Sequence, residues 1–240
     1  MSPPTLILLP GLHGTHHLFD PLLKVIPPNI RTRTLVHPTD ECCAYPELFR
    51  RLEQQLQNEQ HIILFGESFS GPLAIQYSAK YPDRVRALVL CASFAGPPVP
   101  ALLCYLATPL IWLRCPIPGI AIRTFLSGFR APSSLVRETH KTIRLIHPRV
   151  LAHRVREATK VRVKQSLMDC EVPILYLAAT RDRLVGPRAL RRMRRIMPSL
   201  TVETFDAPHL LLQTKPRETW AAMLRFPAIA KWYNPAFTSV

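Results

Sequence analysis

HIILFGESFSGPLAIQYSAKY, residues 61–81, holds a serine where an apolar run gives way to a helix-like stretch. The run at 62–65 is typical of a strand buried on both faces, and the stretch that follows is typical of a helix. Gly66 and Ser70 are small enough to allow a tight strand-to-helix turn that exposes the Ser68 hydroxyl. The stretch therefore predicts a nucleophilic serine, with a capped, buried helix start as the alternative.

A helix that begins at such a turn also points free backbone N–H groups at the reaction centre. These groups would stabilise the negative charge that develops on a substrate carbonyl oxygen. Phe69, the first residue after the serine, is the predicted donor on this side of the site.

The rest of the chain alternates short apolar runs with helix-like stretches. Its 240 residues, 48% hydrophobic and 20% charged, fit one globular domain. The alternation predicts an α/β fold with a mostly parallel sheet of about six strands flanked by helices. The predicted strands are residues 6–9, 34–36, 62–65, 87–91, 174–178 and 202–205, and the predicted helices are residues 46–57, 68–81, 187–197 and 216–226.

One segment, residues 96–165, breaks this alternation. It opens with GPPVP and is helical in pattern over much of its length, so we interpret it as a helical cap inserted between core segments 1–95 and 166–240. The N-terminus lacks a basic region, and its apolar run is too short for a signal peptide or a membrane span. Six scattered cysteines without CxxC spacing indicate reduced thiols and no structural zinc site. A cytoplasmic protein is predicted.

The turn at the serine resembles the nucleophile elbow of the α/β-hydrolase family, G-x-S-x-G. Here the pattern is Gly66-Glu67-Ser68-Phe69-Ser70, with serine in place of the last glycine and Gly71 directly after it. The resemblance covers nearly the whole chain outside the cap. It implies the α/β-hydrolase fold without the two strands that usually lead it.

A second part of the resemblance follows the first predicted strand, where residues 8–15 read LLPGLHGT. In the family, a strand followed by His-Gly and a variable residue supplies the other oxyanion N–H. Proline stands here in place of that histidine, and the resemblance makes Leu12 the donor. A plain turn built on the proline and glycines is the alternative. We interpret His13, His16 and His17 as solvated loop histidines, because no carboxylate or cysteine completes a metal shell.

A serine nucleophile needs a histidine base, and the base needs an acid that fixes its tautomer. The family supplies them in the chain order Ser, Asp, His. Asp182 follows the fifth predicted strand and His209 follows the sixth, so the resemblance implies a triad of Ser68, Asp182 and His209. Asp206 is a rival acid, but it is too near His209 in sequence to face it easily. Taken singly, Asp182 also fits a helix cap and His209 an ordinary loop histidine.

Positive charge is concentrated in the predicted cap. The net charge is +15, and residues 96–165 hold twelve Arg and Lys against two acids, Glu138 and Glu157. Solvated faces are one interpretation, and an acidic carrier protein or anionic surface at the basic cap is the other. Nucleic acid is not expected, because no recognised binding motif accompanies the charge. Basic positions recur at helical spacing in three stripes: Arg137, Lys141 and Arg144; Arg149, His153, Arg156, Lys160 and Lys164; and Arg188, Arg191, Arg192 and Arg195.

The apolar part of the cap, residues 97–113, reads PPVPALLCYLATPLIWL. Its prolines and marginal length argue against a transmembrane helix. We interpret it as the roof of an acyl pocket, with ordinary packing of the cap on the core as the alternative. The candidate pocket residues are Tyr105, Leu106, Leu110 and Trp112.

These features predict a serine carboxylic-ester hydrolase that acts on a small-molecule ester and needs no cofactor and no metal. A narrower alternative is a methyl ester esterase acting on acyl chains bound to acyl carrier protein, similar to the pimeloyl-carrier esterases of biotin synthesis. A non-catalytic binding protein of the same fold is the third hypothesis. A haloalkane dehalogenase is less favoured, because it needs an aspartate nucleophile where this chain has Ser68.

Overall fold

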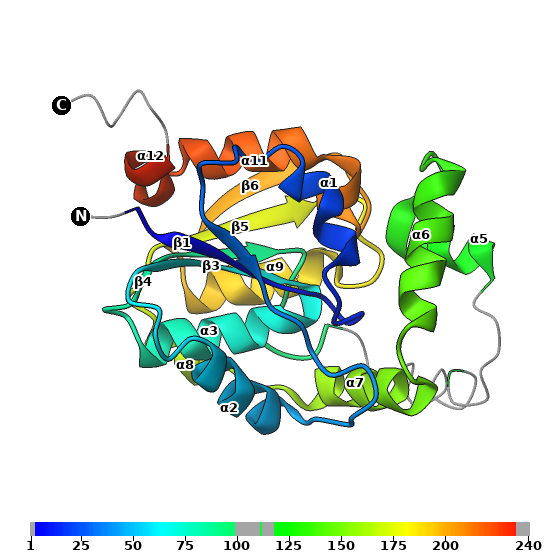
Figure 1. Ribbon diagram of the computed structural model, residues 1–240, viewed down its shortest axis with the longest axis horizontal. Helices are drawn as coiled ribbons and strands as arrows, with labels where there is room; N and C mark the ends of the chain where they lie inside the picture. Colours follow the sequence, from blue (N-terminus) through cyan, green and yellow to red (C-terminus); the bar gives the residue numbers. More distant parts are fainter. Residues whose placement is uncertain (1–2, 99–110, 112–117, 234–240) are drawn as a thin grey trace.

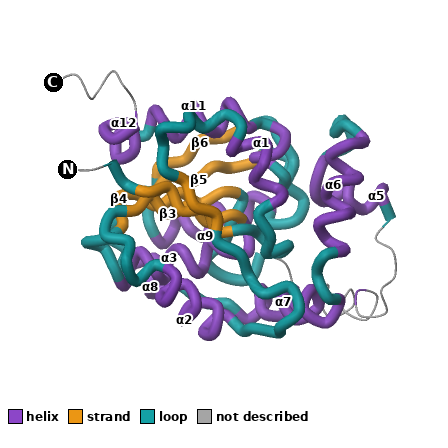
Figure 2. Tube along the Cα trace, viewed as in Figure 1, coloured by secondary structure: helices purple, strands orange, loops and turns teal. Residues whose placement is uncertain are grey.

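The computed structural model describes residues 3–98, 111 and 118–233. Within them, six parallel strands form one sheet in the order β2-β1-β3-β4-β5-β6, with helices on both faces (Figures 1 and 2). This confirms the predicted fold class. The strands are β1 (Thr5–Leu9), β2 (Thr32–Thr34), β3 (Ile62–Glu67), β4 (Val85–Cys91), β5 (Ile174–Ala179) and β6 (Thr201–Phe205).

The described helices form two layers around the sheet. Helices α2, α3, α8 and α9 pack on one face, and α1, α10, α11 and α12 pack on the other (Figure 1). In chain order the helices are η1 (His17–Phe19), α1 (Asp20–Leu23), α2 (Tyr45–Gln55), η2 (Ser68–Ser70), α3 (Gly71–Lys80), α5 (Gly119–Ile122), η3 (Arg123–Ser127), α6 (Ser133–Arg144), α7 (Pro148–Lys160), α8 (Lys164–Met168), α9 (Gly186–Ile196), α10 (Leu211–Thr214), α11 (Pro216–Arg225) and α12 (Pro227–Tyr233).

The strands are continuously apolar because the sheet is buried on both faces. In β1, Ile7 and Leu9 point into the core shared with α2 and α3, whereas Leu6 and Leu8 point into the core shared with α1 and α11. All four side chains are at most 1% exposed. Alternate residues of one strand therefore serve two separate hydrophobic cores.

The predicted strand at 34–36 is wrong in position, since β2 spans Thr32–Thr34. The Leu35 N–H still donates to the Leu8 carbonyl at 2.9 Å, but the His37 N–H donates to the Gly14 carbonyl at 2.8 Å. After Leu35 the chain therefore turns away from the sheet and bonds to the loop that follows β1. Helices α1, α10 and α12 were not predicted, because segments of four to seven residues are too short to show helical periodicity.

The direction in which successive strands are added reverses between β1 and β3. From β1 the chain moves outward to β2, and from β3 it proceeds the opposite way to β4. In open parallel sheets, ligands bind beyond the carboxyl ends of the strands at such a reversal. The loop after β1 and the turn after β3 therefore meet where a substrate is expected.

Helices α5 to α8 lie between β4 and β5 in the chain. The Val163 N–H donates to the Ala95 carbonyl at 3.0 Å, so the two ends of this segment are joined. In Figure 1 the β5 arrow points toward the side on which α5 and α6 stand. The division of the chain into core and cap at residues 96 and 165 stays a prediction. The candidate pocket residues Tyr105, Leu106, Leu110 and Trp112 lie outside the described residues.

None of the helices in the described part of the chain has the length and apolarity needed to cross a bilayer. The cytoplasmic location stays a prediction. Four cysteines fall within the described ranges, and each carries a free thiol: Cys42, Cys43, Cys91 and Cys170.

Candidate active site

Ser68 lies at the sharp turn between β3 and α3. Its φ is 45°, in the left-handed region that residues with a side chain rarely adopt. A Cβ on Gly66 would lie 2.9 Å from the Ala74 Cβ, and a Cβ on Gly71 would lie 1.6 Å from the Ser93 Oγ. Glycine is therefore required at Gly66 and Gly71, whereas Ser70, at φ −83°, is unstrained in place of the family's last glycine.

The strained turn is held from the neighbouring strand. The Ser93 hydroxyl, just beyond β4, donates to the Ser68 carbonyl at 2.7 Å. Ser93 is itself fixed by Tyr176 of β5, whose phenol accepts the Ser93 N–H at 3.1 Å and donates to the Ser93 carbonyl at 2.7 Å. A left-handed backbone at a residue with a side chain costs about 1–3 kcal/mol and persists only where its surroundings hold it. The hydrogen bonds from Ser93 and Tyr176 hold the backbone of Ser68 in this way.

Ser68, His209 and Asp182 form a continuous hydrogen-bonded chain. The His209 Nε2 lies 3.1 Å from the Ser68 Oγ, and the His209 Nδ1 lies 2.8 Å from the Asp182 Oδ2. Their exposed fractions are 7%, 7% and 8%. Asp182 also accepts the N–H groups of Leu184 and Val185 on its Oδ1, at 2.8 and 2.9 Å. The carboxylate is thus fixed on both oxygens.

The rival acid lies elsewhere. Asp206 is exposed and pairs with Arg181, whose Nε lies 2.7 Å from the Asp206 Oδ1. The structure therefore brings Asp182 to His209 and turns Asp206 toward an arginine at the surface.

The electrostatics of the pair favour an ionised acid and a basic imidazole. Burial opposes the charged form of Asp182, but His209 and the Leu184 and Val185 N–H groups outweigh it and lower the Asp182 pKa. Burial likewise opposes protonation of His209, but the Asp182 carboxylate outweighs it and raises the His209 pKa. His209 is consequently a stronger proton acceptor than a free imidazole.

The two predicted oxyanion residues come from the turn after β3 and from the loop after β1. Phe69 is at the start of η2, where helical N–H groups have no partner within the helix. Leu12 lies in the loop after β1, and the Gly14 N–H closes this loop on the Gly11 carbonyl at 3.0 Å. The loop is therefore a tight turn, and the role of Leu12 as an oxyanion donor stays a prediction.

Glu67, between Gly66 and the serine, was missed as a functional residue. Glu67 is 5% exposed. It accepts the Gly11 N–H at 3.1 Å and the Gln213 Nε2 at 3.2 Å, and its Oε2 lies 3.3 Å from the His13 Nε2. Burial disfavours its charge, but contacts with His13, Gln213 and Gly11 outweigh burial and lower the Glu67 pKa. Glu67 therefore joins the loop after β1 to helix α10, which follows His209.

The solvated interpretation of His13 is wrong. His13 is 8% exposed, because its ring is held between Glu67 and Thr15, whose hydroxyl lies 3.3 Å from its Nδ1. His16 is exposed, as expected, and His17 is half-buried. Among the residues that the structure describes, no cluster of histidine, cysteine or carboxylate side chains could hold a metal ion.

Ser70 joins the elbow to two other segments. Its hydroxyl donates to the Pro10 carbonyl, so it accepts from the His37 Nε2–H, 2.8 Å away. Burial, with Arg154 and His13 nearby, lowers the pKa of His37 to about 3, which keeps this imidazole neutral. The serine that departs from the family pattern thus anchors the loop after β1.

Replacing Ser70 with alanine or glycine should lower the free energy of unfolding by about 1–3 kcal/mol, because the buried His37 N–H and Pro10 carbonyl would lose their shared partner. Urea denaturation measures this change. Alanine serves as the control for the added backbone freedom of glycine. A loss confined to the glycine variant would show that flexibility, rather than the hydroxyl, matters at this position.

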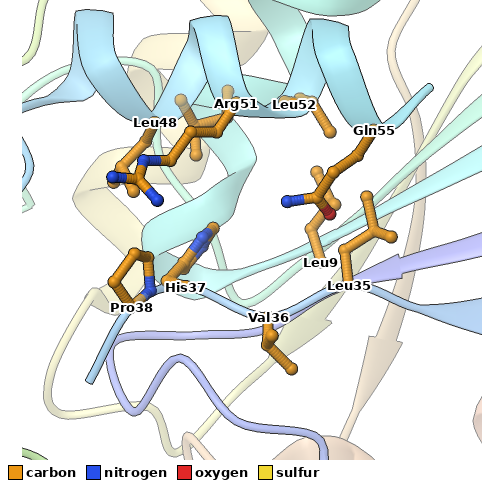
Figure 3. Close-up of a pocket in the computed structure, with 10 residues that line it drawn as sticks. Leu9, Leu35, Val36, His37, Pro38, Leu48, Arg51, Leu52 and Gln55 are labelled. Atoms are coloured by element: carbon orange, nitrogen blue, oxygen red, sulfur yellow. The ribbon is translucent and has the colours of Figure 1, made fainter. Parts of the chain in front are cut away.

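Two cavities in the described structure lie away from Ser68, Asp182 and His209. One, of about 10 Å³, sits between the ends of β1 and β2 and helix α2, lined by Leu9, Leu35, His37, Leu48 and others (Figure 3). It is the size of a single water molecule, too small for a substrate. The other, of about 560 Å³, lies between α2, α3 and the end of α7. Neither is lined by Ser68, Asp182 or His209.

A family model described as serine aminopeptidase, S33, matches residues 33–211, a range that includes Ser68, Asp182 and His209. No sequence among curated proteins matches the chain. Solved structures with the same fold are found in several organisms.

One such structure comes from a study of carboxylesterases of Nitrososphaera gargenis, with 14% identity, a TM-score of 0.82, and coverage of 95% of this chain and 91% of that chain. Another is the enol-lactonase from Burkholderia xenovorans LB400, with 13% identity, a TM-score of 0.80, and coverage of 93% and 91%. A third is the bromoperoxidase from Bacillus anthracis, with 16% identity, a TM-score of 0.81, and coverage of 93% and 91%. At these identities the likeness concerns the fold.

Proposed function

The chain belongs to the α/β-hydrolase family described as serine aminopeptidase, S33, and we propose that this hydrolase cleaves carboxylic esters through an acyl-enzyme intermediate. The observation that carries this proposal is the buried hydrogen-bonded chain from Asp182 through His209 to Ser68. It ends on a serine whose backbone is held in a left-handed conformation at the carboxyl edge of the sheet. This arrangement activates a hydroxyl that is otherwise a poor nucleophile.

In the proposed reaction, the His209 Nε2 takes the proton from the Ser68 Oγ as that oxygen attacks the acyl carbonyl. Asp182 holds the Nδ1–H and stabilises the imidazolium that forms. The N–H groups of Leu12 and Phe69 receive the negative charge on the carbonyl oxygen. The tetrahedral intermediate then collapses, and the leaving alcohol takes the proton from His209. Water, deprotonated by His209, hydrolyses the acyl-enzyme and restores Ser68.

The test is a panel of p-nitrophenyl esters of increasing acyl length beside aminoacyl p-nitroanilides. Aminopeptidase activity is the second candidate, because the family description names it. An aminopeptidase needs a free carboxylate for the substrate ammonium, whereas Glu67 and Asp182, the buried carboxylates at this site, are already engaged. We expect esters to be cleaved far faster. Faster cleavage of the anilides would overturn the ester proposal, and turnover of neither would favour a non-catalytic binding protein.

A narrower substrate, an ester carried by an acidic carrier protein, is supported by exposed cations on the inserted helices. Arg137, Lys141 and Arg144 are exposed on α6, and Arg156 is exposed on α7. Long-range attraction between this surface and an acidic partner would raise the rate of encounter.

Reversing Arg137, Lys141 and Arg156 together to glutamate should slow hydrolysis of a carrier-linked ester about tenfold or more and weaken its salt dependence, because surface charges act mainly on encounter. Hydrolysis of a small neutral ester, measured in the same preparations, is the control and should not change. An equal response of both substrates, or none in either, would contradict the carrier proposal and leave ester hydrolysis standing.

A further inference from the structure

Arg154 is a buried cation that the proposed reaction does not use. It lies on α7, within the segment between β4 and β5, and is 1% exposed. Its Nη1 donates to the Leu12 carbonyl at 2.7 Å, and its Nη2 donates to the Pro38 carbonyl at 2.5 Å. One guanidinium therefore joins α7 to the loop after β1 and to the segment after β2.

Burying the Arg154 cation costs free energy, and a glycine in the loop after β1 leaves space for its guanidinium. The ion pairs recorded among the described residues do not include Arg154, and burial lowers its pKa to about 10, so it stays protonated at neutral pH. A buried cation without a carboxylate partner ordinarily destabilises a protein. Gly14, at φ 72°, has no side chain where the guanidinium passes, and a Cβ there would lie 2.4 Å from the Arg154 Nη1.

The contacts of Arg154 complete a set that fixes three successive peptide units. The N–H of Gly11 is held by Glu67, and the carbonyl of Gly11 is held by the Gly14 N–H. The carbonyl of Leu12 is held by Arg154. The Gly11 carbonyl and the Leu12 N–H belong to one planar peptide unit, so they point in opposite directions. Because that carbonyl and the two neighbouring peptide units are held by hydrogen bonds, the direction of the Leu12 N–H is fixed.

The Leu12 side chain is held by the same helix. It packs against the cluster formed by Ile146, Val150 and Leu151 at the start of α7. The His147 N–H, next to that cluster, donates to the Thr39 carbonyl at 2.8 Å. Helix α7 is therefore docked against the loop after β1 through apolar packing, a backbone bond and the buried guanidinium.

We propose that Arg154 is a positioning residue that orients the Leu12 N–H toward the oxyanion and thereby couples helix α7 to the catalytic centre. This inference rests on the proposed ester hydrolysis. Its effect falls on the transition state, because the oxyanion forms only there. The guanidinium touches neither Ser68 nor His209 by any recorded hydrogen bond, so proton transfer itself should be unchanged.

The test compares Arg154→Met, which keeps the length and loses both donors, with Arg154→Lys, which keeps the charge and can still donate to one carbonyl. Arg162→Met is the matched control, since Arg162 lies just beyond the same helix, is exposed and also donates to two backbone carbonyls. We expect Arg154→Met to lower kcat for a neutral p-nitrophenyl ester by about 10- to 100-fold with KM within about threefold, as slight misplacement of a catalytic group does. Lysine should restore part of kcat, and the control should match the wild type.

A thionoester of the same acyl group separates positioning from general damage. Sulfur is a weak hydrogen-bond acceptor, so thionoester hydrolysis depends less on the oxyanion donors. Arg154→Met should therefore lose more activity on the ester than on the thionoester. Equal losses on both, or an ester kcat within twofold of wild type in folded protein, would overturn the proposal.

If Arg154→Met does not fold, as judged by circular dichroism, Arg154→Lys carries the same comparison and must show the same ester-selective loss. The Ser68→Ala variant separates this inference from the function on which it rests. If Ser68→Ala abolishes hydrolysis and the Arg154 variants behave as wild type, only the positioning role fails. If Ser68→Ala retains activity, the proposed function itself fails.

Discussion

Replacing Ser68 with alanine should lower kcat for ester hydrolysis by at least about a thousandfold, since no other group can form the acyl-enzyme. Alanine keeps the Cβ, so the backbone at φ 45° is no more strained than in the native chain. The bond from the Ser93 hydroxyl to the carbonyl of residue 68 is also kept. The variant should therefore fold normally, and kcat together with thermal unfolding measures both expectations.

A fluorophosphonate probe identifies the nucleophile independently of any chosen substrate. We expect mass spectrometry to find the label on Ser68 in the native protein and nowhere in Ser68→Ala. Ser78→Ala is the matched control, because Ser78 is a buried serine of the adjoining helix α3. Labelling of Ser70 or Ser93, or full turnover by folded Ser68→Ala, would contradict the assigned nucleophile.

The arrangement of Ser68, Asp182 and His209 could be predicted because each follows a strand. Parallel strands end at one edge of the sheet, so residues far apart in sequence meet there once the strand order is known. The alternation of apolar runs with helices was enough to predict that sheet. The small shift of β2 was not predictable, because a contact between His37 and Gly14, in two different loops, draws the chain away from the sheet.

The supporting residues were harder to predict, because their partners come from distant segments. Glu67 and His13 lie 54 positions apart, and Arg154 and Leu12 lie 142 positions apart. Charge patterning treats Arg154 as one more basic residue of the cap. Helical spacing holds a signal, however: Arg154 lies four residues from both Val150 and Ala158, on the buried face of α7. An arginine on an apolar face indicates a buried, hydrogen-bonded cation.

Asp182→Asn should lower kcat by about ten-thousandfold, whereas Asp206→Asn should leave it within about twofold of wild type. The reason is geometric. The Oδ1 of Asp182 accepts two backbone N–H groups, so an asparagine would keep its oxygen there and turn its NH₂ toward His209. The His209 Nδ1 would then have to accept a hydrogen bond and Nε2 would carry the proton, which prevents it from taking the Ser68 proton. Asp206 contacts only a surface arginine within the described contacts.

The pH dependence of kcat/KM also tests which aspartate serves His209. Hydrolysis needs neutral His209, so the rate rises with pH through the His209 pKa. Asp182 raises that pKa against the opposing effect of burial, so removing the carboxylate leaves burial as the main influence. The residual activity of Asp182→Asn should therefore rise at lower pH than that of the wild type, and Asp206→Asn should leave the profile in place. A profile that moves with Asp206 and stays fixed with Asp182 would show that Asp206 is the acid that serves His209.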